Sequence, residues 1–421
     1  MKKGNRMIAC GLDFGTSNSA IGIARGDAVA LAPLEDDKTL IPSAVFFDYE
    51  AHRVLFGSAA ISAYVGQTEG RLMRALKTIL GSPLIDEKTS LGSRMVPLAE
   101  VVGIFVRHLK DKAEAFAGQK ITAVVHGRPV HFVDGDAEAD ARAQAVLETI
   151  ARQAGFNHVV FVPEPIAAAW HYEQTVQAEE LVLIADIGGG TSDFSVVRIG
   201  PQRRGRLDRT EDILSTAGVR VGGTDFDSAL SLAAVMPLFG LGTQLVEKDL
   251  PMPNALYHEL ATWATINFAY TYKNERELGA LALEACEPEK VGRLLTVLGK
   301  RLGHRVAFAV EDAKIALSAM DDAEVSLDFV EHGLAAAATR GGFEGAIGTR
   351  TDRLYRTACD CIAAAGLDGA AIDTVFLTGG SSRVPAVRAA IAEAAPAARL
   401  ATGSDLLSVA SGLTQMAGRM A

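Results

Sequence analysis

Two short turns in the sequence carry the residue types that bind phosphate. Asp13-Phe-Gly-Thr-Ser-Asn-Ser19 follows the apolar run Met7–Leu12, and Asp186-Ile-Gly-Gly-Gly-Thr-Ser-Asp193 follows the apolar run Leu181–Ala185. Glycines leave successive backbone N–H groups accessible, and such concave arrays of donors bind anions, to which Thr and Ser hydroxyls add. The candidate phosphate-binding residues are Gly15, Thr16, Ser17, Asn18, Gly188, Gly189, Gly190 and Thr191.

A carboxylate opens both turns, because Asp13 and Asp186 stand at the same place after their apolar runs. A carboxylate alone would repel a phosphate. Two carboxylates flanking a divalent ion, mainly through water, form a magnesium site. A single glycine-rich turn is most often a plain hairpin, but two matched turns with aligned aspartates favour binding of nucleotide phosphates.

Two further features could belong to the same chemistry. Gly379-Gly380 follows a third apolar run and would allow close approach of the backbone to a base or a ribose. Glu164 lies between Pro163 and Pro165, which stiffen its backbone. Its carboxylate could position water for attack on a γ-phosphate or hold the water shell of a metal. An acid at the start of a helix also simply complements the helix dipole.

Alternating strands and helices must position these residues. Each phosphate turn reads as strand, turn, strand, and the same unit occurs in both halves of the chain, which predicts a duplicated α/β fold. The region from about residue 230 to 320 reads as mostly helical, with a break at Pro251–Pro253. The other expected strands are 121–127, 159–162, 325–330 and 372–378, and the expected helices are 137–155, one starting at 163–170, and 404–421.

Bulk composition narrows the class of protein. A chain of 421 residues with 49% hydrophobic and 22% charged residues is globular and long enough for two or more domains. Its net charge of −10 argues against nucleic-acid and anionic-membrane partners. No segment approaches the roughly 18 apolar residues of a membrane helix, and a cytoplasmic location is expected. The thiols of Cys10, Cys286, Cys359 and Cys361 are expected to bind no metal, because their spacing matches no metal-site pattern.

Five blocks of the sequence together resemble the nucleotide-binding domain of DnaK-type heat-shock chaperones, with the short YegD-type members most similar. They occur in the order of that family and span nearly the whole chain. The blocks are Gly11–Ser19, Pro163–Ala169, Asp186–Asp193, Gly222–Asp227 and Leu377–Pro385.

The resemblance implies a duplicated actin-like (ribonuclease H-like) ATPase fold, with two lobes of four subdomains around a nucleotide cleft. It places lobe I at residues 1–179 with 46–118 as an outer subdomain. Lobe II would be 180–403 with 230–339 as an outer subdomain, and 404–421 a helix returning to lobe I. ATP or ADP with Mg²⁺, and K⁺ as a further ion, would be the ligands.

The resemblance also implies roles for single residues. Lys77, in a segment that resembles the family's catalytic-lysine segment, would reach the γ-phosphate and offset charge that develops during transfer. Asp186 would share the magnesium shell with Asp13, and Glu164 with Thr191 would order the attacking water. Pro129 would couple the nucleotide state to lobe motion. The remaining nucleotide-binding residues would be Gly222, Gly223, Glu311, Lys314, Ser318, Gly379, Gly380, Ser381 and Arg383.

The sequence departs from the family pattern at three places. Ile315 stands where the family usually has an arginine that stacks on adenine, so about 1 kcal/mol of cation–π energy is lost. Residues 230–310 are longer than the family's equivalent, with an added helical piece around Met252–Arg305. The sequence given ends after the last helix of the nucleotide domain, so peptide clamping by a substrate domain is not expected of it.

Three functions remain open from the sequence. The first is a slow, magnesium-dependent ATPase that acts as a chaperone-related or regulatory switch, a monomer with an unidentified protein partner. The second is an actin-like ATPase that forms filaments, although such proteins usually lack the lysine segment. The third is a small-molecule kinase of the same superfold, for which Asp134 or Asp136 would be the catalytic base.

Overall fold

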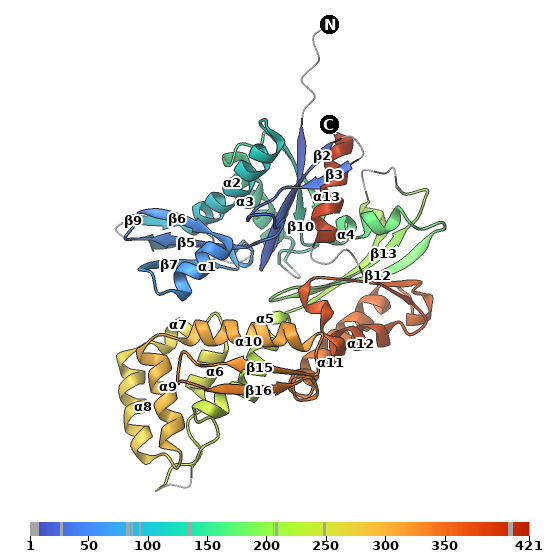
Figure 1. Ribbon diagram of the computed structural model, residues 1–421. Coiled ribbons are helices and arrows are strands. Elements are labelled where there is room, and N and C mark those ends of the chain that lie inside the picture. The colour runs from blue at the N-terminus through green and yellow to red at the C-terminus, as the bar shows by residue number, and fades with distance from the viewer. Residues whose placement is uncertain are drawn as a thin grey trace. The chain divides into compact units, whose positions relative to one another are not determined.

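The fold is described from a computed structural model (Figure 1). It describes residues 8–25, 28–80, 85, 87–91, 94–133, 136–204, 206, 209–246, 250–402 and 407–420. Two compact units make up the chain. Unit 1 comprises Met1–Gly218, Thr357–Ser382 and Ile391–Ala421, and unit 2 comprises Val219–Arg356 and Arg383–Ala390. The lobes expected from the sequence divide the chain by its duplicated pattern rather than by contacts, and they stay a prediction.

Two large sheets in unit 1 have the same strand order. The first runs β11-β10-β1-β2-β3, with β4 also on β2, and the second runs β14-β13-β12-β17-β18. In both, the hairpin strands are antiparallel and the next two strands are parallel. This repeated topology is the duplicated α/β fold that the sequence predicts. The strands are β1 (Ala9–Phe14), β2 (Asn18–Arg25), β3 (Ala28–Leu31), β4 (Ile41–Pro42), β10 (Ala123–Arg128), β11 (His158–Pro163), β12 (Glu180–Ile187), β13 (Ser192–Ile199), β14 (Ile213–Val219), β17 (Thr374–Thr378) and β18 (Arg399–Thr402).

Helices α4 (Glu164–Glu173) and α13 (Ser408–Met420) share one hydrophobic core with both sheets. The core takes Val125 from the first sheet and Ile184 and Phe376 from the second. Close packing of α13 depends on glycine, because a Cβ at Gly412 would lie 1.9 Å from the carbonyl oxygen of Ala167 on α4. The start of α4, which bears Glu164, is therefore built into the centre of unit 1.

A second core covers the opposite face of the first sheet. It is formed by α2 (Leu98–Ala117) and α3 (Ala137–Gln153), which bury apolar side chains against β1 and β10. Asp136 caps α3 by accepting a hydrogen bond from the Ala139 N–H at 2.9 Å. Smaller elements of this part of the chain are β5 (Ala44–Asp48), β6 (Arg53–Phe56), α1 (Gly57–Val65), β7 (Gly70–Arg74), the 3₁₀ turn η1 (Leu76–Ile79), β8 (Lys88–Leu91) and β9 (Arg94–Pro97).

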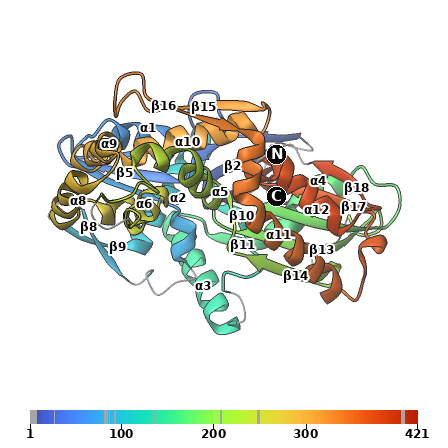
Figure 2. The same cartoon turned by 90° about the horizontal axis from the view of Figure 1, so that it is seen from below.

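Helices α11 (Arg340–Ala364) and α12 (Pro385–Ala394), labelled in Figure 2, each have residues in both units, and the last residues of α11 belong to unit 1. Ser215 Oγ on β14 donates to the Cys361 carbonyl of α11 at 2.6 Å. All four cysteines are free thiols, of which Cys10 and Cys361 are buried and Cys286 is exposed.

Unit 2 is mainly helical, as the sequence predicts for residues 230–320. Helix α10 packs against α5 and the hairpin β15–β16, and α8 packs along α9. The elements are α5 (Gly223–Leu230), the π-helical turn η4 (Ser231–Val235), the 3₁₀ turn η5 (Met236–Phe239), α6 (Ala255–Ala261), α7 (Ile266–Ala269), α8 (Tyr272–Glu284), α9 (Pro288–Gly299), α10 (Gly303–Leu317), β15 (Asp322–Ser326) and β16 (Ala335–Thr339).

One expected strand is wrong in its second half. The sequence predicts a strand over 325–330, but β15 ends at Ser326 and a turn follows. The Val330 N–H bonds to the Leu327 carbonyl, and Asp328 Oδ1 accepts from the Gly333 N–H at 2.8 Å. An aspartate that bonds the nearby backbone stabilises a turn, so the chain reverses into β16.

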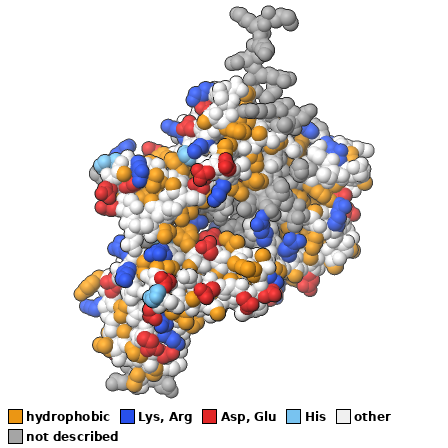
Figure 3. Space-filling model, viewed as in Figure 1, with side chains coloured by type: hydrophobic (Ala, Val, Ile, Leu, Met, Phe, Trp, Pro, Cys, Tyr) orange, Lys and Arg blue, Asp and Glu red, His pale blue; other side chains and the backbone are white. Residues whose placement is uncertain are grey.

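The surface is of mixed charge. Acidic and basic side chains are interspersed over the face in Figure 3. None of the helices that the structure describes has the length and the apolar composition that a membrane crossing requires.

Candidate phosphate and metal site

The first phosphate loop joins β1 to β2, and hydrogen bonds from Ser43 hold it in place. Ser43, between β4 and β5, donates from Oγ to the Gly15 carbonyl at 2.7 Å and from its N–H to the Ser17 carbonyl at 2.8 Å. Its Oγ also lies 2.8 Å from that of buried Ser19. These bonds fix the backbone of the loop through its carbonyl groups. Nothing in the local sequence around Ser43 indicates this role, since the contacts join distant segments.

The second phosphate loop joins β12 to β13 and lies against the first. A Cβ on Gly189 would lie 2.0 Å from Ser17 Oγ, so any larger residue would have to displace the Ser17 hydroxyl where the two loops meet. Within the loop, the Gly188 N–H bonds to the Thr191 carbonyl at 2.9 Å, and Thr191 Oγ1 donates to Asp193 at 3.3 Å. Unit 1 therefore brings together the two loops that the sequence places far apart.

The third glycine turn lies beside the second loop because β12 and β17 are parallel neighbours, with Asp186 opposite Thr378. Gly379 has a φ of +81°, and a Cβ there would lie 2.6 Å from Asp186 Oδ1. Ser381 Oγ donates to the Gly188 carbonyl at 3.1 Å. Gly379, Gly380 and Ser381 thus adjoin the carboxylate of Asp186, at the edge where the strands end.

Lys77 and Glu164 form an ion pair at the same place. Lys77 Nζ donates to Glu164 Oε1 at 2.5 Å, and both side chains are 13% exposed. Lys77 lies in η1, and Glu164 is the first residue of α4, directly after β11. Pro165 favours this helix start because its fixed φ suits the first turn. The contact joins residues 87 positions apart in the chain, so local sequence pattern cannot reveal it.

Charge is unbalanced in this cluster, in which Asp13, Glu164 and Asp186 surround the single ammonium of Lys77. Burial and then the Glu164 carboxylate raise the pKa of Asp13 to about 8, against the opposing effect of Lys77. Burial, Glu164 and Asp193 likewise raise the pKa of Asp186 to about 7. Burial disfavours the Lys77 ammonium, but the surrounding carboxylates outweigh it and raise the Lys77 pKa. Among the described residues, the cluster thus holds more carboxyl groups than cations.

A divalent cation fits this excess of negative charge. In the part of the chain that the structure describes, no three His, Cys, Asp or Glu side chains are arranged to bind a metal directly. A metal at this site would therefore take most of its ligands from water and phosphate, as the sequence predicts for Asp13 and Asp186. Magnesium suits such a site because it retains several waters when bound beside carboxylates and phosphates.

His126 and Asp193 complete the surroundings of the cluster and were not predicted from the sequence. His126 on β10 is fully buried, its Nδ1 lies 2.7 Å from the Gly127 carbonyl, and burial lowers its pKa to about 4. Asp193 lies opposite Asp186 in the β12–β13 hairpin. The mirrored spacing of the two aspartates around the loop is the signal that would have found Asp193.

Glu311, Lys314 and Ser318, which are predicted to bind adenosine, lie in unit 2. Lys314 on α10 forms an ion pair with Asp227 on α5 at 2.7 Å, and its Nζ is 3.5 Å from the Gly223 carbonyl. Gly222 precedes α5, and its N–H bonds to Asp225 at 2.9 Å. Ser318 follows the last residue of α10. Lys314 is thus already tied to the Gly222–Gly223 turn, and Glu311 is partly exposed on the same helix.

The remaining predicted residues lie on several different elements. Ile315, the departure from the family pattern, is 60% exposed, and Arg383 is exposed at the end of η7 (Gly380–Arg383). Pro129 lies in the loop after β10, which Arg128 ties down through the Pro129 and Val130 carbonyls. The Asp136 carboxylate is engaged as the cap of α3. Asp134 lies outside the described residues.

Two glycine-rich hairpins at equivalent edges of two sheets with one strand order define an actin-like nucleotide-binding fold. A family model described as Hsp70 protein matches residues 81–237 and 297–403, which is more than half of the chain. The chain belongs to the Hsp70 family. It is an ATP-binding, Hsp70-like protein with the actin-like ATPase fold of that family. The match includes Glu164 and the second and third loops, whereas residues 238–296, within unit 2, lie outside it.

Proposed function

We propose that this protein is a slow, Mg²⁺-dependent ATPase whose response to nucleotide acts as a chaperone-related or regulatory switch. The single observation that supports it best is the unbalanced cluster of Asp13, Glu164 and Asp186 around Lys77, at the meeting point of the glycine loops. A cluster with more carboxyl groups than cations, next to anion-binding N–H groups, suits a metal ion and a phosphate together, because the metal can displace the protons that the carboxyl groups hold.

The loops would hold the phosphates of ATP or ADP. Backbone N–H groups of Gly15–Asn18 and Gly189–Thr191 would donate to phosphate oxygens, with hydroxyl groups of Thr16, Ser17 and Thr191 as further donors. Gly188 would shape the second loop, because its N–H bonds to the Thr191 carbonyl. Asp13 and Asp186 would hold the water shell of a magnesium ion, which when bound neutralises charge on the phosphates. A potassium ion beside the phosphates is a further expectation from the family.

Lys77, Glu164 and Thr191 would carry the hydrolytic step. The Lys77 ammonium, now paired with Glu164, lies where a γ-phosphate would offer it a second anionic partner, and its charge would stabilise the transition state. The Glu164 carboxylate would accept a hydrogen bond from the attacking water and the Thr191 hydroxyl would help to orient that water. We expect slow turnover, as the resemblance to the family implies.

Adenosine binding would involve residues of unit 2. Glu311, Lys314 and Ser318 would bond the ribose and base, with Gly222, Gly223 and Arg383 close to them. Because Ile315 offers apolar contact in place of cation stacking, we expect a lower affinity for the base. Pro129 would couple nucleotide state to motion of the lobes, and binding of a protein partner would depend on that motion.

A phosphate-release assay with MgATP tests this proposal. We expect slow release that stops when EDTA removes magnesium and that needs no added sugar or acid. Sedimentation of the same samples separates the filament alternative, because filaments would pellet with ATP while a switch would stay in the supernatant. Absence of both phosphate release and an ATP-dependent rise in melting temperature would contradict the proposal.

A further inference from the structure

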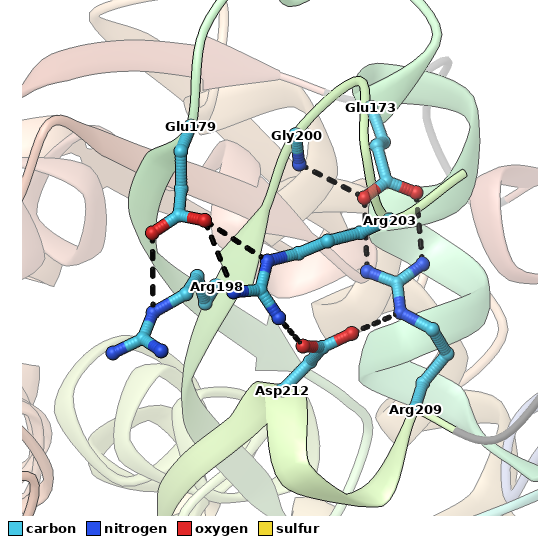
Figure 4. A network of polar contacts seen from close by, with 7 residues as sticks. All are labelled: Glu173, Glu179, Arg198, Gly200, Arg203, Arg209 and Asp212. Atoms are coloured by element: carbon cyan, nitrogen blue, oxygen red, sulfur yellow. Dashed lines mark hydrogen bonds and ion pairs between the residues drawn. The ribbon is translucent and has the colours of Figure 1, made fainter. Parts of the chain in front are cut away.

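The end of α4 opposite Glu164 is held by a buried ion network (Figure 4). The Glu173 carboxylate accepts two hydrogen bonds from the Arg209 guanidinium, both at 2.9 Å, and a third from the Gly200 N–H at 3.0 Å. The side chains of Glu173 and Arg209 are 1% and 4% exposed. A two-pronged arginine–carboxylate contact of this kind fixes direction as well as distance.

The network continues outward from this pair with alternating charge. Arg209 Nε also bonds to Asp212, and Asp212 bonds to Arg203. Arg203 then bonds to Glu179, which is 58% exposed, with contacts at 3.1 and 3.0 Å. Buried acids and arginines are therefore matched, and the network reaches the surface only at its far end.

Two further arginines fasten the same end of α4. Arg204 donates to the Glu173 carbonyl at 2.9 Å, which a helix end leaves without an internal partner, and to the Val176 carbonyl in the segment that follows the helix. The Trp170 ring lies 4.8 Å from the Arg419 guanidinium on α13 and 6.0 Å from that of Arg209. We call Arg204, Arg209 and Arg419 the arginine collar.

The middle of α4 fixes the position of the helix along its own axis less firmly than the two ends do. Between its ends the buried residues among the described side chains are Pro165, Ile166, three consecutive alanines and Trp170. Small side chains interlock weakly with neighbouring ridges, so such a helix face resists sliding along its axis less than a face of large side chains does. The contacts at the two ends therefore add to the close packing of Ala167 on Gly412 in fixing where α4 sits along its axis.

A fixed axial position matters because Glu164 and Glu173 are the two ends of one helix, about 14 Å apart at 1.5 Å per residue. A shift of the Glu173 end is carried to Glu164 by the rigid helix between them. A displacement of about 1 Å at a reacting group can cost about 100-fold in rate.

We propose that the arginine collar is a positioning device for Glu164, with Glu173 and Arg209 as positioning residues for ATP hydrolysis, a role that rests on the proposed function. Stability alone does not require such a network, since well-packed apolar residues commonly replace buried ion pairs without loss. The forked contact supplies what apolar packing does not, which is a defined direction for the helix end.

Glu173→Gln tests the proposal, with single-turnover hydrolysis and the Kd for ATP measured on the full chain. We expect hydrolysis to fall at least tenfold while the Kd changes less than threefold, because Glu173 lies a whole helix away from the phosphate loops. Arg209→Lys should act alike, since an ammonium cannot form the fork. Glu179→Gln is the matched control at the exposed end of the network and should hydrolyse ATP as the parent does.

The double variant Glu173→Leu with Arg209→Met separates positioning from stability, because it removes both charges and keeps apolar volume. We expect its melting temperature to approach that of the parent while hydrolysis stays at least tenfold lower. Hydrolysis that recovers together with melting temperature, or that is unchanged in Glu173→Gln, would overturn the collar proposal alone. A parent protein that hydrolyses no ATP would overturn the proposed function and the collar with it.

Discussion

The two ends of α4 carry ion clusters of opposite character. At the Glu173 end, two buried acids meet the guanidinium groups of Arg203 and Arg209, and hydrogen bonds connect them. At the Glu164 end, three carboxylates surround one lysine, and the pKa values of Asp13 and Asp186 rise to about 8 and 7. One helix thus joins a balanced cluster to an unbalanced one.

This difference separates structural charge from functional charge. A buried cluster whose charges cancel needs nothing from outside, so it can serve the fold. A cluster with excess charge is destabilising unless a ligand supplies the opposite charge, which is why strongly shifted pKa values tend to mark functional sites. By this criterion we propose that the Glu164 end is the binding site and that the Glu173 end supports it.

The fold should be destabilised when one partner of the balanced cluster is removed. Arg209→Ala leaves the buried Glu173 without its fork and Asp212 without one of its two arginines, and we expect unfolding free energy to fall by about 3–5 kcal/mol. Chemical denaturation measures this. Arg198→Ala, which removes a 38% exposed arginine at the outer edge of the network, should change stability by less than about 1 kcal/mol. Equal losses in the two variants would contradict the assignment of a buried structural network.

The unbalanced end should lose chemistry rather than stability. Lys77→Ala removes the one cation of the cluster, and we expect ATP turnover to fall about 100-fold with ATP binding nearly intact. Single-turnover phosphate release and calorimetric binding measure the two quantities. Lys120→Ala is the control, because this lysine also pairs with a glutamate but is 84% exposed and belongs to a different cluster. Turnover equal to that of the parent would remove Lys77 from the mechanism.

Affinity for MgATP should rise with pH. Asp13 and Asp186 must lose protons to accept a cation, and their pKa values of about 8 and 7 place that loss between pH 6 and pH 8.5. We expect the Kd to fall about tenfold over this range, since one pKa unit corresponds to a tenfold change in a linked equilibrium. ATP itself also titrates in this range, and comparison with Asp13→Asn removes that contribution. The Kd of the variant should change less with pH than the Kd of the parent. If the Kd of both proteins changed equally with pH, Asp13 would not face the cation.

The smallest effect expected is a gain in stability from Asp13→Asn. A carboxyl whose folded pKa is raised stabilises the fold only while protonated, so its contribution is full below pH 4 and is lost as pH rises towards 8. We therefore expect the variant to be more stable than the parent by about 1 kcal/mol or more at pH 8.5 without magnesium, and nearly equal to it at pH 4. Thermal melts at both pH values measure this. A variant that is less stable at pH 8.5 would contradict the charge excess.

The sequence predicts most of what is local in this site. Glycine turns after apolar runs gave both phosphate loops, and the position of Glu164 between two prolines indicated a helix start. The role of Lys77 came only from the family resemblance. Local patterns could reveal the loops because turn residues and their flanking strands are adjacent in the chain.

The parts that the sequence does not predict depend on contacts between distant segments. Ser43 braces the first loop from a position between β4 and β5, and Arg209 reaches Glu173 from another turn. Neither residue type is unusual where it stands. The strand expected over 325–330 failed for the reverse reason, since apolar residues there suggested a strand that the bonds of Asp328 end.

Proton release on binding of MgATP tests the central claim most directly. Calorimetric titration at pH 7 in two buffers of different ionisation enthalpy gives the number of protons released. We predict binding with net proton release from the parent and a smaller release from Asp13→Asn, because a cation displaces the proton that the excess of carboxylates retains. Binding without proton release, or equal release from both proteins, would contradict the claim that the unbalanced end of α4 is the metal and nucleotide site.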